Sequence, residues 1–209
     1  MDWDEFLAPY EQAVSELKIK LRGIRKQFNQ SKTEHSPIEF VTGRVKTKES
    51  ILEKCELRGV DPSRIAEEIQ DIAGLRIMCQ FTDDIDEVIQ IIKQRRDMKV
   101  VKEVDYISNI KDSGYRSYHL IIEYPVQLIS GEKKLFAEIQ IRTLAMNFWA
   151  TIEHSLNYKY RGEYPKEIRE RLRRAAEAAS MLDNEMSEIR DEIREAQQYF
   201  NHQRTEKKG

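Results

Sequence analysis

The chain has 209 residues, 40% of them hydrophobic, which is enough for one sizeable core but too short for two large catalytic domains. Its 35 Lys and Arg residues are matched by 37 Asp and Glu residues, so the net charge of −2 excludes an overall positive field, and affinity for polyanions must come from local clusters. The acidic N-terminus and the lack of a long apolar stretch argue against a secretory signal and a membrane span. We therefore expect a soluble, cytoplasmic protein with no membrane partner and with two reduced cysteines.

The N-terminal part is predicted to be helical. Apolar residues recur every three or four positions over Phe6–Phe28, which indicates one long amphipathic helix, and a polar break over 29–36 ends it. Pro37 suits the first turn of a second helix, expected over Pro37–Arg58 and stopped by Gly59. The Asp-Pro-Ser turn at 61–63 starts a short third helix.

The middle of the chain predicts a mixed sheet with covering helices. The four predicted strands are Ile72–Cys79, Lys99–Tyr106, Tyr118–Tyr124 and Lys134–Arg142. A helix is expected over Asp84–Arg95, and the last two strands are joined through Pro125 and the Ser-Gly-Glu turn at 130–132. This pattern indicates an α/β or α+β core.

The C-terminal third carries a regular heptad pattern over Ile168–Phe200, with apolar residues at alternating steps of four and three. Such a helix packs either on its own core or on another subunit. Because the apolar seam is longer than so small a core can cover, we expect a homo-oligomer. The tail, residues 201–209, is expected to be disordered.

One basic segment, Gly43–Ser50, combines three cations and two hydroxyl groups beside a glycine. Phosphates favour such an arrangement, because Lys and Arg neutralise charge and the plane of an Arg can also stack on a base. The alternative is an ordinary solvated helix face.

Two charged residues stand at the first predicted strand. Asp71 immediately precedes it, and Arg76 lies inside it. A charge in a buried strand is costly unless it is paired or functional, so we expect Arg76 to reach a cleft at the sheet surface. Strict alternation puts Asp71 and Arg76 on opposite faces, unless a bulge at Gly74 brings them together.

The strand over Phe136–Arg142 has one apolar and one polar face, the polar one carrying Glu138, Gln140 and Arg142. Together with Asp71, Glu138 offers the hard oxygen ligands that Mg²⁺-dependent nucleotide chemistry requires.

The loop at 111–119 sets a glycine before an aromatic residue, with Lys, Arg and His nearby. An exposed aromatic ring on such a turn can stack on a base while the cations hold its phosphates. The alternative is a hairpin turn with incidental aromatic residues.

These motifs, in this order, resemble the synthetase motifs of the RelA/SpoT homologue family. The resemblance covers about residues 40–160 and rests on Arg44-x-Lys46-x-x-x-Ser50, Asp71, Asp105-Tyr106-Ile107, Lys111, Gly114-Tyr115-Arg116-Ser117-Tyr118-His119 and Glu138-Ile139-Gln140-Ile141-Arg142-Thr143. The segments at 35–43 and 145–150 are similar to those of the RelQ-type small alarmone synthetases. The implied fold is α+β, a mixed-sheet nucleotidyltransferase-like core flanked by long N- and C-terminal helices.

The implied activity is that of a (p)ppGpp synthetase, or GTP diphosphokinase. It transfers the β,γ-pyrophosphate of ATP to the 3′-hydroxyl of GDP or GTP, releases AMP, and serves the stringent response. The long family members also carry a metal-dependent hydrolase domain with an adjacent His-Asp pair. No histidine of this chain precedes an aspartate, so no hydrolase activity is expected.

The resemblance also implies residue roles. The ATP site consists of Arg44, Lys46, Ser50 and Arg76, the two arginines stacking on adenine. The GDP/GTP site consists of Lys111, Tyr115, His119, Gln140 and Asn147, with Tyr115 stacking on guanine. Asp71 and Glu138 bind Mg²⁺, and Glu138 is the base for the 3′-hydroxyl.

Assembly and regulation follow from the same resemblance. It divides the chain into an oligomerisation helix (1–36), the synthetase core (37–160) and a second oligomerisation helix (161–200), and it implies a homotetramer. A cleft between subunits would bind pppGpp as an allosteric activator through Lys18, Arg22, Phe40, Thr42 and Asn147. Ordinary solvated charges are the alternative for Lys18 and Arg22. Single-stranded RNA is a further candidate partner.

Two other functions compete with the enzyme. A catalytically idle nucleotide sensor or RNA-binding regulator would have lost a metal carboxylate, but both Asp71 and Glu138 are present. A template-independent nucleotidyltransferase acting on RNA would show a closely spaced Asp pair, which this sequence lacks at that site.

Overall fold

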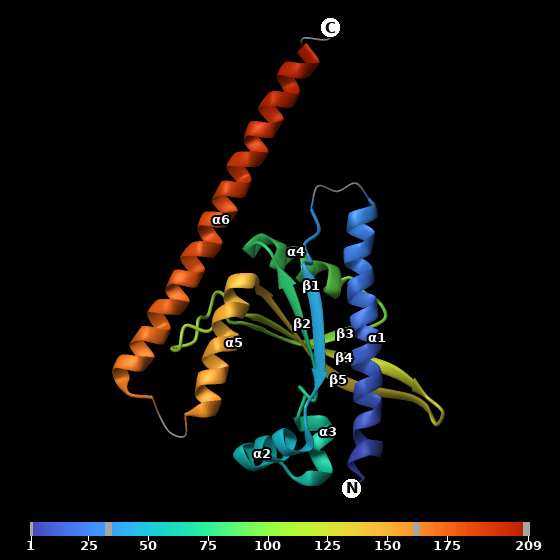
Figure 1. Cartoon of the computed structure of the whole chain (residues 1–209). Helices are drawn as coiled ribbons and strands as arrows, with labels where there is room; N and C mark the ends of the chain where they lie inside the picture. The colour runs from blue at the N-terminus through green and yellow to red at the C-terminus, as the bar shows by residue number, and fades with distance from the viewer. Residues whose placement is uncertain (1, 32–34, 161–163, 207–209) are drawn as a thin grey trace.

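The computed structural model describes residues 2–31, 35–160 and 164–206. Its elements are drawn in Figure 1. They follow in the order α1 (Trp3–Gln30), β1 (Phe40–Val45), α2 (Lys48–Arg58), the 3-10 helix η1 (Pro62–Arg64), α3 (Ile65–Glu68), β2 (Ala73–Cys79), α4 (Thr82–Lys93), β3 (Lys99–Asp105), β4 (Tyr118–Leu128), β5 (Gly131–Thr143), α5 (Leu144–Lys159) and α6 (Lys166–Glu206).

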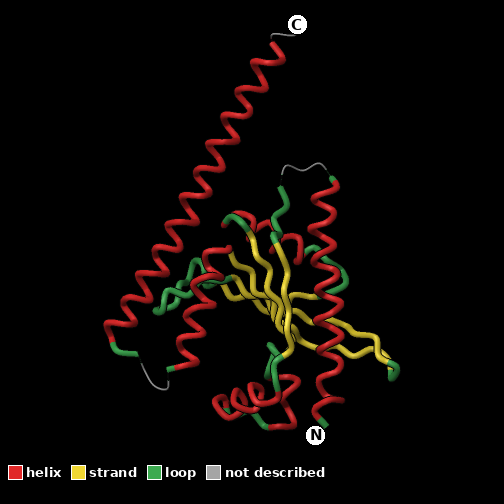
Figure 2. The backbone as a smooth tube through the Cα atoms, in the orientation of Figure 1, coloured by secondary structure: helices red, strands yellow, loops and turns green. Residues whose placement is uncertain are grey.

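The five strands form one mixed sheet in the order β1-β2-β5-β4-β3, seen in yellow at the centre of Figure 2. Only the central pair, β2 and β5, is parallel; the other three pairs are antiparallel. The connection between the parallel strands contains α4, β3 and β4. The structure therefore confirms the predicted α+β class with a mixed sheet.

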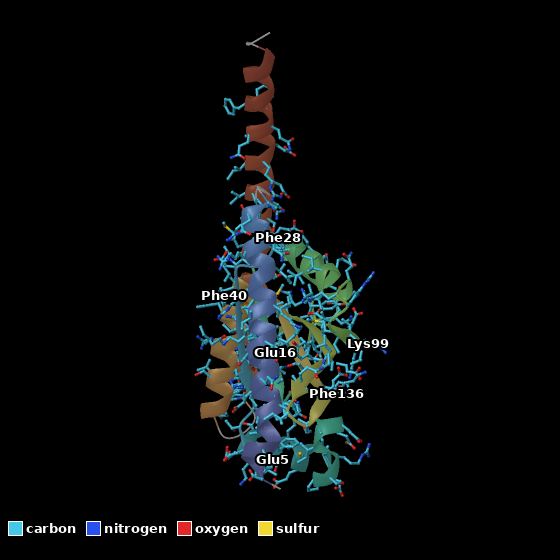
Figure 3. All side chains as sticks on the ribbon, turned by 90° about the vertical axis from the view of Figure 1, so that its right-hand side faces the viewer. Glu5, Glu16, Phe28, Phe40, Lys99 and Phe136 are labelled. Carbon is cyan, nitrogen blue, oxygen red and sulfur yellow. The ribbon has the colours of Figure 1, made fainter. Side chains whose placement is uncertain are left out.

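Helix α1 lies across one face of the sheet, as Figure 3 shows from the side of this helix. Asp2 caps its first turn by accepting hydrogen bonds from the backbone N–H groups of Asp4 and Glu5. The predicted apolar stripe is buried along its middle, with Leu17 and Leu21 fully covered, and is partly buried at its ends, Phe6 and Phe28. The long N-terminal helix is thus confirmed, and it stabilises the fold by packing its stripe on the sheet.

The main core lies between the sheet and the helices on this face. Helix α4 contributes Val88 and Ile89 to the same cluster as α1. Along β2 and β5 the core residues alternate with partly exposed ones, so the opposite face of these strands is left for polar side chains. Both cysteines, Cys55 and Cys79, are buried free thiols.

The second predicted helix is wrong over its first half. Residues Phe40–Val45 form β1, and α2 begins only at Lys48, after Thr47 accepts a hydrogen bond from the Ser50 N–H as its N-cap. The strand forms because β1 pairs in register with β2 over its whole length, a tertiary contact that outweighs local helix preference. The helix ends as predicted at Gly59, whose φ of +64° suits glycine.

Two further expectations need correction. Pro125 lies inside β4 instead of ending it, because the pairing of β4 with β3 stops at Glu123 and one edge of β4 needs no donor beyond that point. The C-terminal helix continues to Glu206, past the expected start of the disordered tail, since no Gly or Pro interrupts it there. Residues 207–209 of that tail lie outside the described part of the chain.

Helices α5 and α6 pair with each other on the side of the molecule away from α1 (Figure 1). The indole N–H of Trp149 donates to the backbone oxygen of Leu172 at 2.9 Å, and the Thr143 hydroxyl donates to Asp183 at 2.6 Å. The C-terminal half of α6 projects beyond the rest of the fold (Figure 1). No helix within the described ranges is both long and apolar enough to span a bilayer.

Candidate active site

A cavity of about 300 Å³ opens on the polar face of the central strands. Six of the predicted catalytic and nucleotide-binding residues line it: Arg44, Lys46, Asp71, Arg76, Glu138 and Gln140. Strand register explains the gathering, because Gly74 pairs with Arg44 on one side and with Glu138 on the other. The missing Cβ of Gly74 leaves open space between these two longer side chains.

Asp71 and Arg76 both line this cavity, and no bulge at Gly74 is needed to bring them together. The pairing of β2 with its two neighbours is regular, and Asp71 lies in the turn ahead of the strand, where alternation does not apply. Arg76 pairs with Thr42 and Gln140, so it falls on the same face as Arg44 and Glu138. The prediction that Arg76 reaches a cleft is confirmed.

Asp71 is a mostly buried carboxylate held by two lysines. Its Oδ2 lies 2.5 Å from Nζ of Lys54 and 3.2 Å from Nζ of Lys46. Burial raises the pKa of Asp71, but the hydrogen bond from Lys54 and the charges of both lysines outweigh it and hold that pKa below its usual value. The second oxygen, Oδ1, is buried and has no hydrogen-bond partner among the described residues.

Glu138 has a partner on each oxygen. Its Oε1 lies 2.9 Å from Nδ1 of His119, and its Oε2 accepts a hydrogen bond from the Gln140 amide at 2.8 Å. Burial raises the pKa of Glu138, yet its contacts with His119 and Gln140 bring the pKa below the usual value. Asp71, which lines the same cavity, acts in the opposite direction and raises the pKa of Glu138.

The pair Asp71 and Glu138 fits a divalent cation. A buried carboxylate oxygen without a partner is costly unless something binds it, and Oδ1 of Asp71 is such an atom. No group of three or more His, Cys, Asp and Glu side chains suited to a metal occurs among the residues described. Two carboxylates are the number that leaves coordination positions for waters and phosphate oxygens, as Mg²⁺ prefers.

Positive charge surrounds the carboxylates. Burial, followed by the nearby charges of Arg142 and Arg44, lowers the pKa of Arg76, as expected for cations gathered in one place. Arg76 also donates to Oε1 of Gln140 at 3.4 Å. A polyanion entering the cavity would relieve this repulsion, so the arrangement favours a phosphate chain.

The aromatic ring of Tyr115 lies beside His119, with ring centres 5.9 Å apart, and is not exposed, contrary to the prediction. Gly114, at φ +88°, turns the chain so that the ring is half-buried. The Tyr115 hydroxyl lies 2.8 Å from Nε2 of His119 and accepts from Nη2 of Arg142 at 2.5 Å. Nζ of Lys111 lies 5.0 Å from the centre of the ring. The predicted acceptor residues Lys111, Tyr115 and His119 therefore do lie together.

Five predicted nucleotide residues lie outside the cavity lining: Lys111, Tyr115 and His119, which lie together as described, and also Ser50 and Asn147. Ser50 sits in the first turn of α2, where its hydroxyl accepts from Thr47 at 3.2 Å. Asn147 lies in the first turn of α5, half-buried.

The five predicted allosteric residues are spread over several elements. Arg22 and Phe40 line a separate cavity of about 450 Å³ beside α1 and β1. Lys18 lies on α1 over Gly43, whereas Thr42 lines the central cavity. Asn147, on α5, lines neither of these two cavities. The single chain does not form one cleft from these residues.

Two residues of the site were missed from the sequence. Lys54 contacts Asp71, and its position four residues after Ser50, on the same helical face, was a usable signal. For Arg142, the sequence predicts a place on the polar face of its strand but no role. Arg142 is only 4% exposed and donates to Tyr115 and Gln140, a contact that only the folded sheet reveals.

The chain is similar in sequence and structure to known proteins. A sequence profile described as the region found in RelA / SpoT proteins matches residues 43–163. The chain is 61% identical over 198 residues to GTP pyrophosphokinase YjbM of Bacillus subtilis (strain 168), across 95% of this chain and 93% of the relative.

Two solved structures of small alarmone synthetase 1 from Bacillus subtilis are similar to this fold. The one bound to its product pppGpp has a TM-score of 0.88 and 60% identity, and covers 91% of this chain and 97% of its own. The one bound to AMPCPP has a TM-score of 0.81 and 56% identity, and covers 92% of this chain and 98% of its own.

Proposed function

The chain belongs to the RelA/SpoT family and is a GTP pyrophosphokinase, and from this premise we propose that it makes (p)ppGpp by transferring the β,γ-pyrophosphate of ATP to the 3′-hydroxyl of GDP or GTP. One observation carries the proposal: two interacting carboxylates, Asp71 and Glu138, lie in one cavity with Arg44, Lys46 and Arg76. The charges suit a triphosphate beside a hydroxyl acceptor.

ATP takes the side of the cavity formed by β1, β2 and the start of α2. Arg44 and Arg76 stack on adenine, which their neighbouring register positions support. Lys46 and Ser50 hold the phosphates, and the related structure bound to AMPCPP supports an adenine nucleotide as a ligand of the protein. The Ser50 hydroxyl accepts from Thr47, so its own proton is available for donation to a phosphate oxygen.

The guanine nucleotide takes the side of Tyr115. Its base stacks on the ring and displaces the exposed side chain of Lys111, which then turns to the acceptor's phosphates near His119. Gln140 and Asn147 are further contacts of this nucleotide.

Glu138 orients the 3′-hydroxyl and accepts its proton. The O3′–Pβ bond forms as the bond from Pβ to the α–β bridging oxygen breaks, and AMP leaves with that oxygen. Asp71 and Glu138 are the residues that would hold Mg²⁺, which supplies charge neutralisation at the phosphate oxygens. With both substrates held in line, catalysis rests on positioning and on the cationic lining.

Assembly and regulation complete the proposal. The apolar residues of α6 that face solvent, such as Leu182 at 56% exposure, support a homotetramer built through α1 and α6. Lys18, Arg22, Phe40, Thr42 and Asn147 then form a pppGpp-activated cleft when residues of two subunits combine. Single-stranded RNA remains a candidate ligand of these basic surfaces, and the stringent response in the cytoplasm is the setting where ATP and GTP are available.

The test incubates the purified protein with labelled ATP, Mg²⁺ and either GDP or GTP, followed by separation of the products. Formation of AMP and of a guanosine 3′-diphosphate in equal amounts is expected. Release of AMP without a labelled guanine nucleotide would contradict the proposal, as would nucleotide addition to RNA.

A further inference from the structure

Arg142 is a buried cation whose hydrogen bonds all go to neutral groups. It is 4% exposed, and its guanidinium donates to the hydroxyls of Ser117 and Tyr115 and to the amide oxygen of Gln140. Among the described residues it forms no ion pair with a carboxylate within 4.0 Å. Burying a cation without a carboxylate partner costs desolvation free energy, so a buried Arg in this position calls for a functional explanation.

The hydrogen bonds around Arg142 close into a ring of five side chains. Nη2 of Arg142 donates to the Tyr115 hydroxyl at 2.5 Å and to Oε1 of Gln140 at 2.7 Å. The Tyr115 hydroxyl lies 2.8 Å from Nε2 of His119, whose Nδ1 lies 2.9 Å from Oε1 of Glu138. The Gln140 amide nitrogen donates to Oε2 of Glu138 at 2.8 Å. Both series of hydrogen bonds that reach Glu138 therefore start at Nη2 of Arg142.

The direction of every bond in the ring follows from Arg142. A guanidinium only donates, so Oε1 of Gln140 accepts, and the amide nitrogen of Gln140 must face Glu138. The Tyr115 oxygen also accepts from Arg142, which leaves the Tyr115 proton for Nε2 of His119 and the Nδ1 proton of His119 for Glu138. Every hydrogen bond in the ring therefore has one donor and one acceptor, and each carboxylate oxygen of Glu138 accepts one bond.

Other groups that face the ring do not replace Arg142. Arg76 donates to Oε1 of Gln140 as well, but at 3.4 Å, and it does not contact the Tyr115 branch. Lys111 faces the rings of Tyr115 and Tyr106, with Nζ 5.0 Å and 4.3 Å from their centres. Within the described residues, Arg142 alone reaches both branches.

We infer that Arg142 is a positioning residue of the synthetase reaction, which orients the base Glu138 through Gln140 on one side and through Tyr115 and His119 on the other. This inference rests on the proposed function. It assigns Arg142 no contact with either substrate. Its effect should fall on turnover, because misplacing a catalytic group by about 1 Å can cost about 10²-fold in rate.

The experiment compares kcat and both KM values for Arg142→Met, Arg142→Lys, Tyr115→Phe and the double variant Arg142→Met with Tyr115→Phe. Arg142→Met should lower kcat by about 10²-fold with the KM for ATP within about 2-fold of wild type. Arg142→Lys should recover part of the loss. The double variant should be little slower than Arg142→Met, because the Tyr115 hydroxyl acts in the same chain.

Ser117→Ala is the matched control, since it removes the third hydrogen-bond partner of the same guanidinium and leaves the ring closed. It should change thermal stability but keep kcat within about 3-fold. Should Arg142→Met not fold, Arg142→Lys and Tyr115→Phe carry the test, each expected to lower kcat.

The results separate the inference from the proposed function. Wild-type protein that forms no (p)ppGpp would overturn both. Active wild-type protein would overturn the inference alone if the folded Arg142 variants kept wild-type kcat, if the losses in the double variant multiplied, or if Ser117→Ala lost as much as Arg142→Met.

Discussion

Lys54 holds one oxygen of Asp71 at 2.5 Å and leaves the other oxygen without a partner. The carboxylate is thus fixed in position and still has one oxygen for a further ligand. Lys54 comes from α2 and Asp71 from the turn before β2, so the contact also joins α2 to the start of this strand. An enzyme that binds a nucleotide between these elements gains a preset carboxylate at the point where the phosphates arrive.

The first prediction concerns the two carboxylates. Asp71→Asn and Glu138→Gln keep side-chain volume but remove the charge proposed to bind Mg²⁺, so each should lower kcat/KM by roughly 10³-fold or more while the far-UV circular dichroism stays that of wild type. The control is Glu132→Gln, an exposed carboxylate in the β4–β5 hairpin, which should keep full activity. Near-normal Mg²⁺-dependent turnover in either site variant would refute the metal assignment.

The second prediction concerns the acceptor side. Tyr115→Ala removes the proposed stacking surface and should raise the KM for GDP or GTP by roughly 5- to 150-fold, with the KM for ATP little changed. Tyr115→Phe keeps the ring and should leave the acceptor KM close to wild type. Equal increases for both nucleotides in initial-rate measurements would show that the loop is not specific for the acceptor.

The polar face of β5 could be predicted from sequence alone, because the alternation of Glu138, Gln140 and Arg142 depends only on the period of a strand. The same holds for α1, whose apolar stripe is long and regular. Strand β1 could not be predicted, since it offers one buried residue, Val41, and forms through pairing with β2.

Contacts between distant segments explain the remaining differences. Asp71 reaches the cavity because it lies in a turn, and a turn has no alternation from which its direction can be read. The burial of Tyr115 depends on Arg142, 27 residues later, and on α6, whose Ala176 lies against Gly114. Local patterns give no information on such contacts.

The third prediction concerns the ion pair that joins α1 to the loop before β3. It is tested by measuring stability as a function of pH. The Arg95 guanidinium holds the pKa of Asp97 at about 2, with Lys20 of α1 as the second partner at 2.9 Å. Because this pKa is depressed relative to about 3.9 in the unfolded chain, the contribution of Asp97 to stability is complete above pH 4 and is lost as the pH falls toward 2.

Asp97→Asn should therefore unfold at a lower temperature than wild type at pH 7, and the two midpoints should converge near pH 2. NMR titration of the Asp97 carboxyl gives the pKa directly. In Lys20→Met the pKa should rise only in part, since both hydrogen bonds from Arg95 remain. A midpoint difference that did not change between pH 7 and pH 2 would show that the charge of Asp97 does not contribute.

The last prediction concerns assembly. Leu182 and Ile189 lie one heptad apart on α6 and are exposed to 56% and 39% in the single chain, and Leu182 also lines an apolar cavity of about 750 Å³ between α5 and α6. If another subunit covers them, placing charges there costs desolvation in the assembled state and nothing in the separate chain. The double variant Leu182→Asp with Ile189→Asp should give smaller species than wild type in light scattering. It should also lose any activation by added pppGpp, because an effector bound between subunits acts only through states of the oligomer.

The control replaces two exposed α6 residues, Glu188→Gln with Glu195→Gln, and should assemble as wild type. If the double Asp variant scatters as wild type does, or if wild-type turnover is indifferent to pppGpp, then α6 does not couple assembly to activity, and the exposed seam has another use.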